Sequence, residues 1–134
     1  MATVKGTLSL SSTDLLSDAI SFSTSFTHAT AKNSTGLARE KITSTAKGTA
    51  SGQVTLYTAD DYAAIAYLYI KNTDTTAANK IYIYNDSTTG DPIWMQLNGG
   101  DFAFVPMHGD KTLKAYAPNG SDPVIEWMVF GTDQ

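Results

Sequence analysis

Short runs in which apolar and polar residues alternate strictly, each ended by turn-forming residues, follow one another along most of this chain. In the clearest run, 20–28, Ile20, Phe22 and Phe26 alternate with hydroxyl-bearing residues. Side chains of a β-strand point to its two faces in turn, so a period of two predicts a half-buried strand. Further strands are predicted at 3–10, 54–57, 65–70, 80–84, 93–97, 101–106, 111–116 and 124–130. Their spacing predicts an all-β fold, a jelly-roll-like antiparallel β-sandwich of about 8–10 strands with little helix.

The 134 residues fit a single β-sandwich domain, because no linker and no repeat divides them. The first part of the chain is more polar than the rest. Its segment 29–52 holds the only arginine, Arg39, and few large aliphatic residues, Leu37 among them. An extended arm, an edge strand and a long loop all fit this composition. We therefore predict a core over 53–134, with 1–52 as a candidate N-terminal arm or set of edge strands.

Two neighbouring segments carry more specific expectations. The nearly continuous apolar run 62–70 predicts a strand covered on both faces, with a helix over 59–69 as the alternative. A polar stretch separates this run from the next alternating one. The sequence therefore predicts a hairpin with a long loop over 65–84.

The stretch 99–109 is a compact apolar strand that two glycines open and a proline and a further glycine close. Alternation places Phe102 and Phe104 on one face and Ala103 and Val105 on the other. We expect the larger pair to fill the core. The smaller pair is then expected to lie against a crowded or partner-covered face.

Composition excludes several classes of function. The net charge of −4 opposes non-specific attraction to nucleic acid or to anionic lipid, so neither is an expected partner. The chain has no cysteine, which rules out disulfides and thiolate metal sites. Neither a signal peptide nor a run long and apolar enough to cross a membrane is evident, so no membrane partner is expected.

The strand that ends near His108 also resembles, imperfectly, a metal-binding motif. Gly100 and Asp101, followed by Pro106 and His108, are similar to the second motif of cupins, but nothing upstream is similar to the first. A catalytic metal needs about three converging protein ligands, and the chain has two histidines and two glutamates. The favoured interpretation is a core strand with a turn at each end, and His108 as a surface or interface residue.

Other catalytic groups are equally sparse. No Gly-x-Ser-x-Gly elbow is present. Glu126 shares a strand face with apolar residues, and is interpreted either as a general acid or, preferably, as a carboxylate that pairs with a lysine or points out of the sandwich. We therefore predict that the chain is not an enzyme and binds no cofactor and no metal.

Tyrosines are numerous for a domain of this size, and alternation places Tyr67 and Tyr69 on one face. Cross-strand pairing within the sheet is the favoured role, while an interface or a carbohydrate-stacking surface is the alternative. The candidate interface residues of the chain are Ile20, Phe22, Phe26, Leu37, Arg39, Tyr67, Tyr69 and His108.

Four segments, together with the Thr- and Ser-rich start, carry a family resemblance: 54–62, 68–73, 100–106 and 125–130. In these the chain resembles small virion structural proteins of tailed bacteriophages, especially those of marine and cyanobacterial hosts. The resemblance implies a capsid decoration or cement protein made in the host cytoplasm. Such a protein sits on the capsid exterior as a homo-oligomer, with a trimer favoured, and binds the major capsid protein or another virion protein. A tail or fibre component is one alternative, and a carbohydrate-binding or cupin-like module is another.

Overall fold

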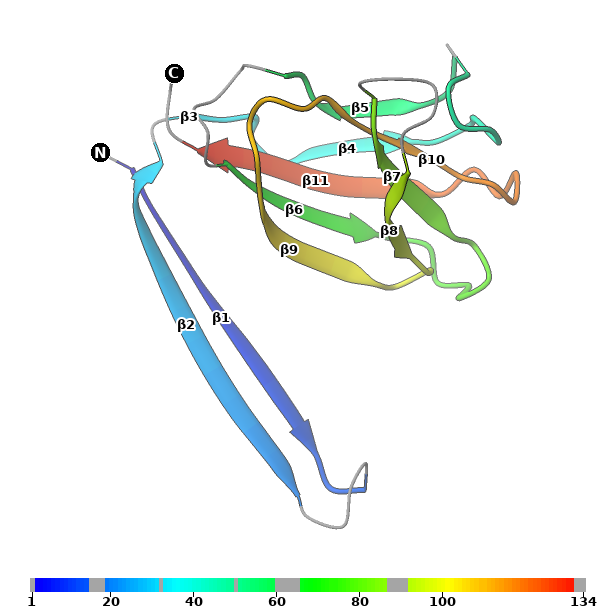
Figure 1. Ribbon diagram of the computed structural model, residues 1–134. Helices are drawn as coiled ribbons and strands as arrows, with labels where there is room; N and C mark the ends of the chain where they lie inside the picture. The colour runs from blue at the N-terminus through cyan, green and yellow to red at the C-terminus, as the bar shows by residue number, and fades with distance from the viewer. Residues whose placement is uncertain are drawn as a thin grey trace. The chain divides into compact units, whose positions relative to one another are not determined.

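All regular structure in the described part of the chain is β-strand. The computed structural model describes residues 2–14, 19–31, 33–49, 51–59, 66–86 and 92–131, and these ranges contain no helix (Figure 1). They form two compact units, Met1–Lys32 and Asn33–Gln134. The all-β antiparallel prediction is confirmed for these ranges. The predicted division near residue 52 stays a prediction.

The first unit is a two-stranded antiparallel ribbon. Strand β1 (Ala2–Ser12) pairs with β2 (Ile20–Ala31) along almost its whole length. Leu10 lies opposite Phe22 in this register. Residues that face each other across an antiparallel pair point to the same side, so the ribbon has one alternating set of side chains on each face.

The described residues of the second unit form nine strands in two antiparallel sheets. They are β3 (Asn33–Ser34), β4 (Ala38–Lys41), β5 (Val54–Tyr57), β6 (Ala66–Asn72), β7 (Ile81–Asn85), β8 (Ile93–Leu97), β9 (Phe102–Met107), β10 (Leu113–Tyr116) and β11 (Val124–Gly131). One sheet has the order β5-β10-β7-β8. In the other, β3 and β4 both pair with β11, which continues to β6 and then β9. Thus 29–52, for which an arm, an edge strand and a loop were open alternatives, contributes the edge strands β3 and β4.

The strand pairs are nested along the chain. β7 pairs with β8, β6 with β9, β5 with β10, and β4 with β11. Two further pairings, β6 with β11 and β7 with β10, join these ribbons into the two sheets. Consecutive strands from β4 to β7 therefore alternate between the sheets.

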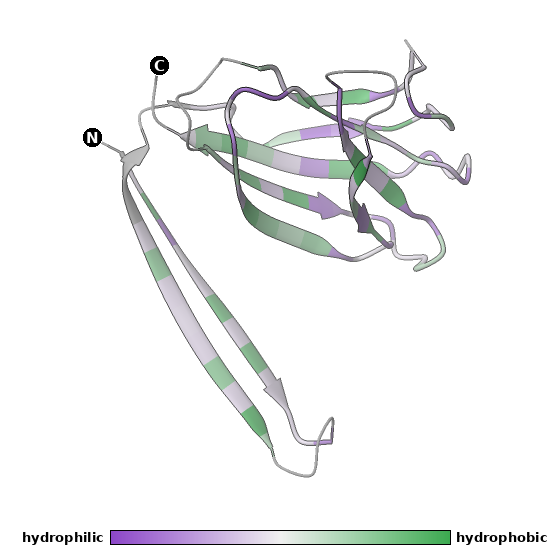
Figure 2. Cartoon of the chain, in the orientation of Figure 1, coloured by the Kyte–Doolittle hydropathy of each residue, from purple (hydrophilic) through white to green (hydrophobic). Residues whose placement is uncertain are grey.

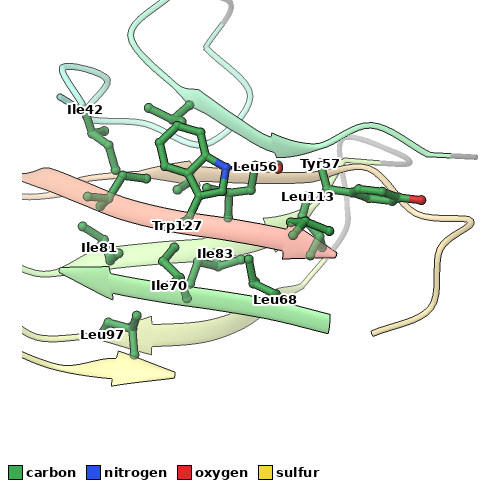
Figure 3. Packing of buried hydrophobic residues seen from close by; sticks show 14 of the residues in the cluster. Ile42, Leu56, Tyr57, Leu68, Ile70, Ile81, Ile83, Leu97, Leu113 and Trp127 are labelled. Atoms are coloured by element: carbon green, nitrogen blue, oxygen red, sulfur yellow. Dashed lines mark hydrogen bonds between the residues drawn. The ribbon is translucent and has the colours of Figure 1, made fainter. Parts of the chain in front are cut away.

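One apolar core lies between the two sheets. Figure 3 shows side chains of both sheets meeting there, among them Leu68 of β6 and Ile83 of β7, which are fully buried. Trp127 of β11 reaches across, because its Nε1 donates a hydrogen bond to the carbonyl of Leu56 on β5 at 3.2 Å. Sheets that share a core in this way are consistent with a β-sandwich.

The predicted hairpin over 65–84 is wrong, because β6 and β7 belong to different sheets. The polar stretch between them crosses from one sheet to the other, and the fully buried Asn72 holds the crossing. Its Nδ2 donates to the carbonyls of Asn79 at 2.7 Å and Leu97 at 3.4 Å, and its Oδ1 accepts from the backbone of Asp74 at 3.2 Å. A side-chain amide therefore satisfies three backbone groups, two in the crossing and one in β8.

The carboxylate of Asp74 organises the same crossing. It accepts hydrogen bonds from the Thr76 backbone at 2.8 Å and from Asn79 Nδ2 at 2.9 Å. These bonds, the one from Thr76 first, hold the pKa of Asp74 below its ordinary value. The loop is thus closed by its own polar side chains.

The expected facing of β9 is wrong. Phe102 is 59% exposed, whereas Ala103 and Val105 pack against the core. β9 is the edge strand of its sheet, and Phe104 stacks instead on Tyr67 of the neighbouring strand, with ring centroids 5.8 Å apart. Alternation identifies which residues share a face, but not which face the core covers.

The expected two-sided burial of 62–70 holds only in part, and 60–65 lies outside the described residues. From 66 to 72 buried residues alternate with partly exposed ones, so one face of β6 is covered and the other is partly open. The helix alternative is wrong for this segment, which is a central strand between β9 and β11.

Two glycines with the same backbone conformation give a matched test of the turn that precedes β5. Gly48 and Gly52 have φ values of 78° and 79°. A Cβ at Gly48 would meet nothing, whereas one at Gly52 would lie 2.6 Å from the Ser44 nitrogen. We expect Gly48→Ala to lower the free energy of unfolding by roughly 1–2 kcal/mol through the left-handed conformation alone. We expect Gly52→Ala to lower the free energy of unfolding clearly more, as measured by urea denaturation. Equal losses for the two variants would contradict the close approach of Gly52 to the Ser44 backbone.

Candidate interaction surfaces

The β1–β2 ribbon has one apolar face that is open to solvent. Leu8 and Leu10 of β1 are 44% and 54% exposed, and Phe22 of β2 is 50% exposed. In the register of the ribbon all three point to the same side, together with Ile20 and Phe26. Green bands alternate with pale bands along both strands in Figure 2. The predicted interface residues of the ribbon therefore share one surface, which we call the ribbon face.

The ribbon face carries no charged side chain among its central pairs, which are Gly6 with Phe26, Leu8 with Thr24, and Leu10 with Phe22. The opposite face presents hydroxyl groups, and Ser9 and Ser23 bond to each other there at 3.1 Å. A Cβ at Gly6 would overlap the Phe26 ring, so this ring lies directly over the glycine. The ribbon is therefore amphipathic, with one uncharged apolar face and one face of hydroxyl-bearing side chains.

The outer face of the β4-β11-β6-β9 sheet holds a cluster of three aromatic rings. Tyr67 stacks on Phe104 and on Phe130, with centroids 5.8 and 5.5 Å apart, and the two phenylalanines are 6.0 Å apart. Phe130 is only 1% exposed, although it points away from the sandwich core. Of the two roles considered for Tyr67, cross-strand pairing is the one that these contacts support.

Tyr69 lies on the same outer face and contacts the carboxylate of β11. Its hydroxyl donates to Glu126 Oε1 at 3.3 Å. Burial, followed by the charge and the hydrogen bond of Glu126, raises the pKa of Tyr69 above its ordinary value. Glu126 therefore points out of the sandwich, as the favoured interpretation predicted, and the phenol beside it stays protonated.

Leu37 and Arg39 lie at the β4 edge of this sheet. Leu37 is 63% exposed immediately before β4, and Arg39 lies opposite Glu126 in the register. The outer sheet face thus brings together three of the predicted interface residues, namely Arg39, Tyr67 and Tyr69. His108 lies in the connection that follows β9.

His108 borders a pocket at one end of the sandwich. The pocket has a volume of about 430 Å³ and takes its lining from both sheets: Asn85, Pro92, Ile93, Trp94, Pro106, Met107, His108, Lys111 and Leu113. His108 Nδ1 pairs with Asp110 Oδ1 at 2.8 Å, and Lys111 Nζ lies 3.7 Å from the other oxygen of the same carboxylate. Of these residues, the cupin-like motif of the sequence included only Pro106 and His108, because residues from four strands carry no common spacing.

The described residues hold no group of three or more histidine, aspartate or glutamate side chains that could bind a metal ion. Within the same ranges, no helix is long and apolar enough to cross a membrane.

Comparisons with protein-family models, with curated proteins and with solved structures return no match.

Proposed function

We propose that this chain is a bacteriophage virion structural protein, a capsid decoration or cement protein that binds the outer shell and other copies of itself and performs no catalysis. The observation that carries the proposal is the ribbon face, where Leu8, Leu10 and Phe22 are about half exposed on an uncharged surface. The resemblance of the sequence to small phage virion proteins is the reason for proposing the phage capsid as the partner.

The free energy of burying apolar side chains favours the binding of another protein to the ribbon face. A two-stranded ribbon by itself is at most marginally stable in water. Covering a half-exposed Leu or Phe side chain contributes on the order of 1 kcal/mol. Three such side chains lie on the ribbon face, so its burial against another protein stabilises both the contact and the ribbon. The lack of charge there means that a second copy can lie against it without repulsion.

The size of the ribbon face favours a closed ring over a simple dimer. β1 has 11 residues, and a two-stranded ribbon of this length presents a face of roughly 400 Å². A stable interface buries about 800 Å² on each partner. In a ring each chain makes two contacts, so further surface can be buried with a second neighbour. The proposed trimer is the smallest such ring.

We also propose that the second unit is a jelly roll. Nested pairing supports this, because β4 to β7 run out along the chain and β8 to β11 return beside them, each returning strand next to its counterpart. A long antiparallel ribbon rolled up in this way gives two sheets of four strand positions, which is the jelly-roll plan found in viral capsid proteins, lectins and cupins. The short strand β3 extends the position of β4 along β11.

The phage that encodes this sequence allows a direct test. Its purified particles are separated into heads and tails, and each fraction is analysed by quantitative peptide mass spectrometry. We expect peptides of this chain in the head fraction, in a fixed ratio to the major capsid protein. Peptides found in tails alone contradict the decoration role and support a tail or fibre component. Their absence from both fractions contradicts a virion role.

A further inference from the structure

We propose that the pocket at the end of the sandwich binds a pyranose sugar, with Trp94 as the stacking surface. This site shares no residue with the ribbon face, and all its lining residues belong to the second unit. At about 430 Å³ the pocket falls within the range of small-molecule sites. Its chemistry, rather than its size, selects the ligand.

Trp94 is placed by an irregularity in the β7–β8 pairing. Ile83 pairs with Met95, but the next residue, Tyr84, pairs with Ile93, so Trp94 is the extra residue of a β-bulge. Such bulges redirect a side chain and are frequent beside binding sites. Trp94 is 45% exposed and borders the pocket. An exposed indole offers a flat, electron-rich face on which the C–H bonds of a sugar ring can lie.

A buried hydrogen-bond acceptor also lines the pocket. Asn85 pairs with Leu113 in the β7–β10 register, so its side chain points to the inner side of the sheet at the end of the sandwich. Its Oδ1 is buried and accepts no hydrogen bond. A purely apolar ligand would leave this oxygen unpaired, whereas a sugar hydroxyl can donate to it.

The charges at the mouth of the pocket are largely paired. Asp110 contacts His108 at 2.8 Å and Lys111 at 3.7 Å. One carboxylate thus lies beside the ammonium of Lys111, which weakens selection for an anionic ligand. The second imidazole nitrogen of His108 and the ammonium of Lys111 still provide polar contacts. A neutral molecule with several hydroxyl groups matches this set.

The connection that carries these groups is anchored on several sides. Tyr57 Oη donates to the carbonyl of Gly109 at 2.6 Å, and the backbone of Ala59 donates to Thr112 Oγ1 at 3.0 Å. The Asp86 backbone donates to the carbonyl of Thr112 at 2.9 Å. In Figure 1 this segment arches from β9 to β10, which belong to different sheets. The backbone of the connection that carries His108 and Lys111 is therefore anchored at Gly109 and Thr112.

The test is a fluorescence titration of the full chain with methyl glucoside, methyl galactoside and N-acetylglucosamine. Trp94 is exposed and Trp127 is only 7% exposed, so a ligand on the indole face changes the Trp94 emission. We expect saturable binding of at least one sugar in the millimolar range. Trp94→Ala should abolish the signal, and His108→Ala should weaken binding by about tenfold, as expected when a hydrogen bond is lost.

Phe102→Ala is the matched control, because Phe102 is an aromatic residue of similar exposure outside the pocket lining. Its substitution should leave sugar binding unchanged. Two-dimensional NMR follows binding to Trp94→Ala independently of the lost fluorophore. The proposal is overturned if no sugar shifts either signal, if Trp94→Ala still binds sugar at the original affinity, or if octanoate binds while every sugar fails.

Discussion

Replacing Leu10 and Phe22 together with serine is expected to dissociate the assembled protein into single chains. The two residues lie opposite each other on the ribbon face and are 54% and 50% exposed. Removing both takes away two of the three most exposed apolar side chains of the ribbon face, at a cost on the order of 1 kcal/mol per side chain for each contact. Size-exclusion chromatography with light scattering measures the change in mass.

Ser11→Thr with Ser21→Thr is the matched control for this experiment. These residues also pair in the ribbon, but on the opposite, hydroxyl-bearing face. The control should keep the mass of the parent protein. Neither double variant should change the unfolding of the sandwich, because its core residues all lie beyond residue 41. A Leu10→Ser, Phe22→Ser protein that keeps the parent mass would show that the ribbon face is not the contact.

Asn72→Ala is expected to lower the free energy of unfolding by about 2–4 kcal/mol. The side chain is fully buried and bonds to the carbonyls of Asn79 and Leu97 and to the backbone of Asp74. Alanine would leave these two carbonyls and the Asp74 backbone N–H without a hydrogen-bond partner, and water cannot readily replace the amide because the site is buried. Urea denaturation followed by tryptophan fluorescence measures the loss, since Trp127 lies in the core.

Asn119→Ala is the control for Asn72→Ala. Asn119 also donates its amide to a carbonyl of the crossing loop, that of Ala78, but it is exposed. Water can replace this bond, so the expected loss is within about 1 kcal/mol. Comparable losses for the two variants would mean that Asn72 does not hold the crossing between the sheets.

Strand positions could be predicted from the sequence because alternation is a local property. The period of two in 20–28 predicted β2, and the same period in 3–10 predicted most of β1. Both leucines were absent from the predicted interface, although the alternation already placed them on one side. Their exposure depends on what covers that side, which a single strand does not reveal.

Pairing between distant strands was the harder part. The polar stretch after β6 has the composition of a hairpin loop, and it is the strand order that shows a crossing between sheets. In β9, alternation did not indicate that Phe102 would be exposed and that Ala103 would pack against the core. Both outcomes follow from packing against residues that lie far away in the sequence.

The pocket shows a further limit of sequence reasoning. Trp94 enters it through an irregular pairing with β7, while Asn85 and Leu113 come from two other strands. None of these residues forms a motif with His108, which was examined for metal binding instead. A site formed by several strands at the end of a sandwich can be recognised only when the strand order is known.

Sedimentation equilibrium of the intact chain over a wide range of concentrations tests the central claim most directly. A single chain has a mass of 14.3 kDa. Self-association through the ribbon face predicts a mass that rises with concentration to three times this value and then stays constant, as for a closed ring. A mass of one chain at every concentration would contradict the proposed assembly.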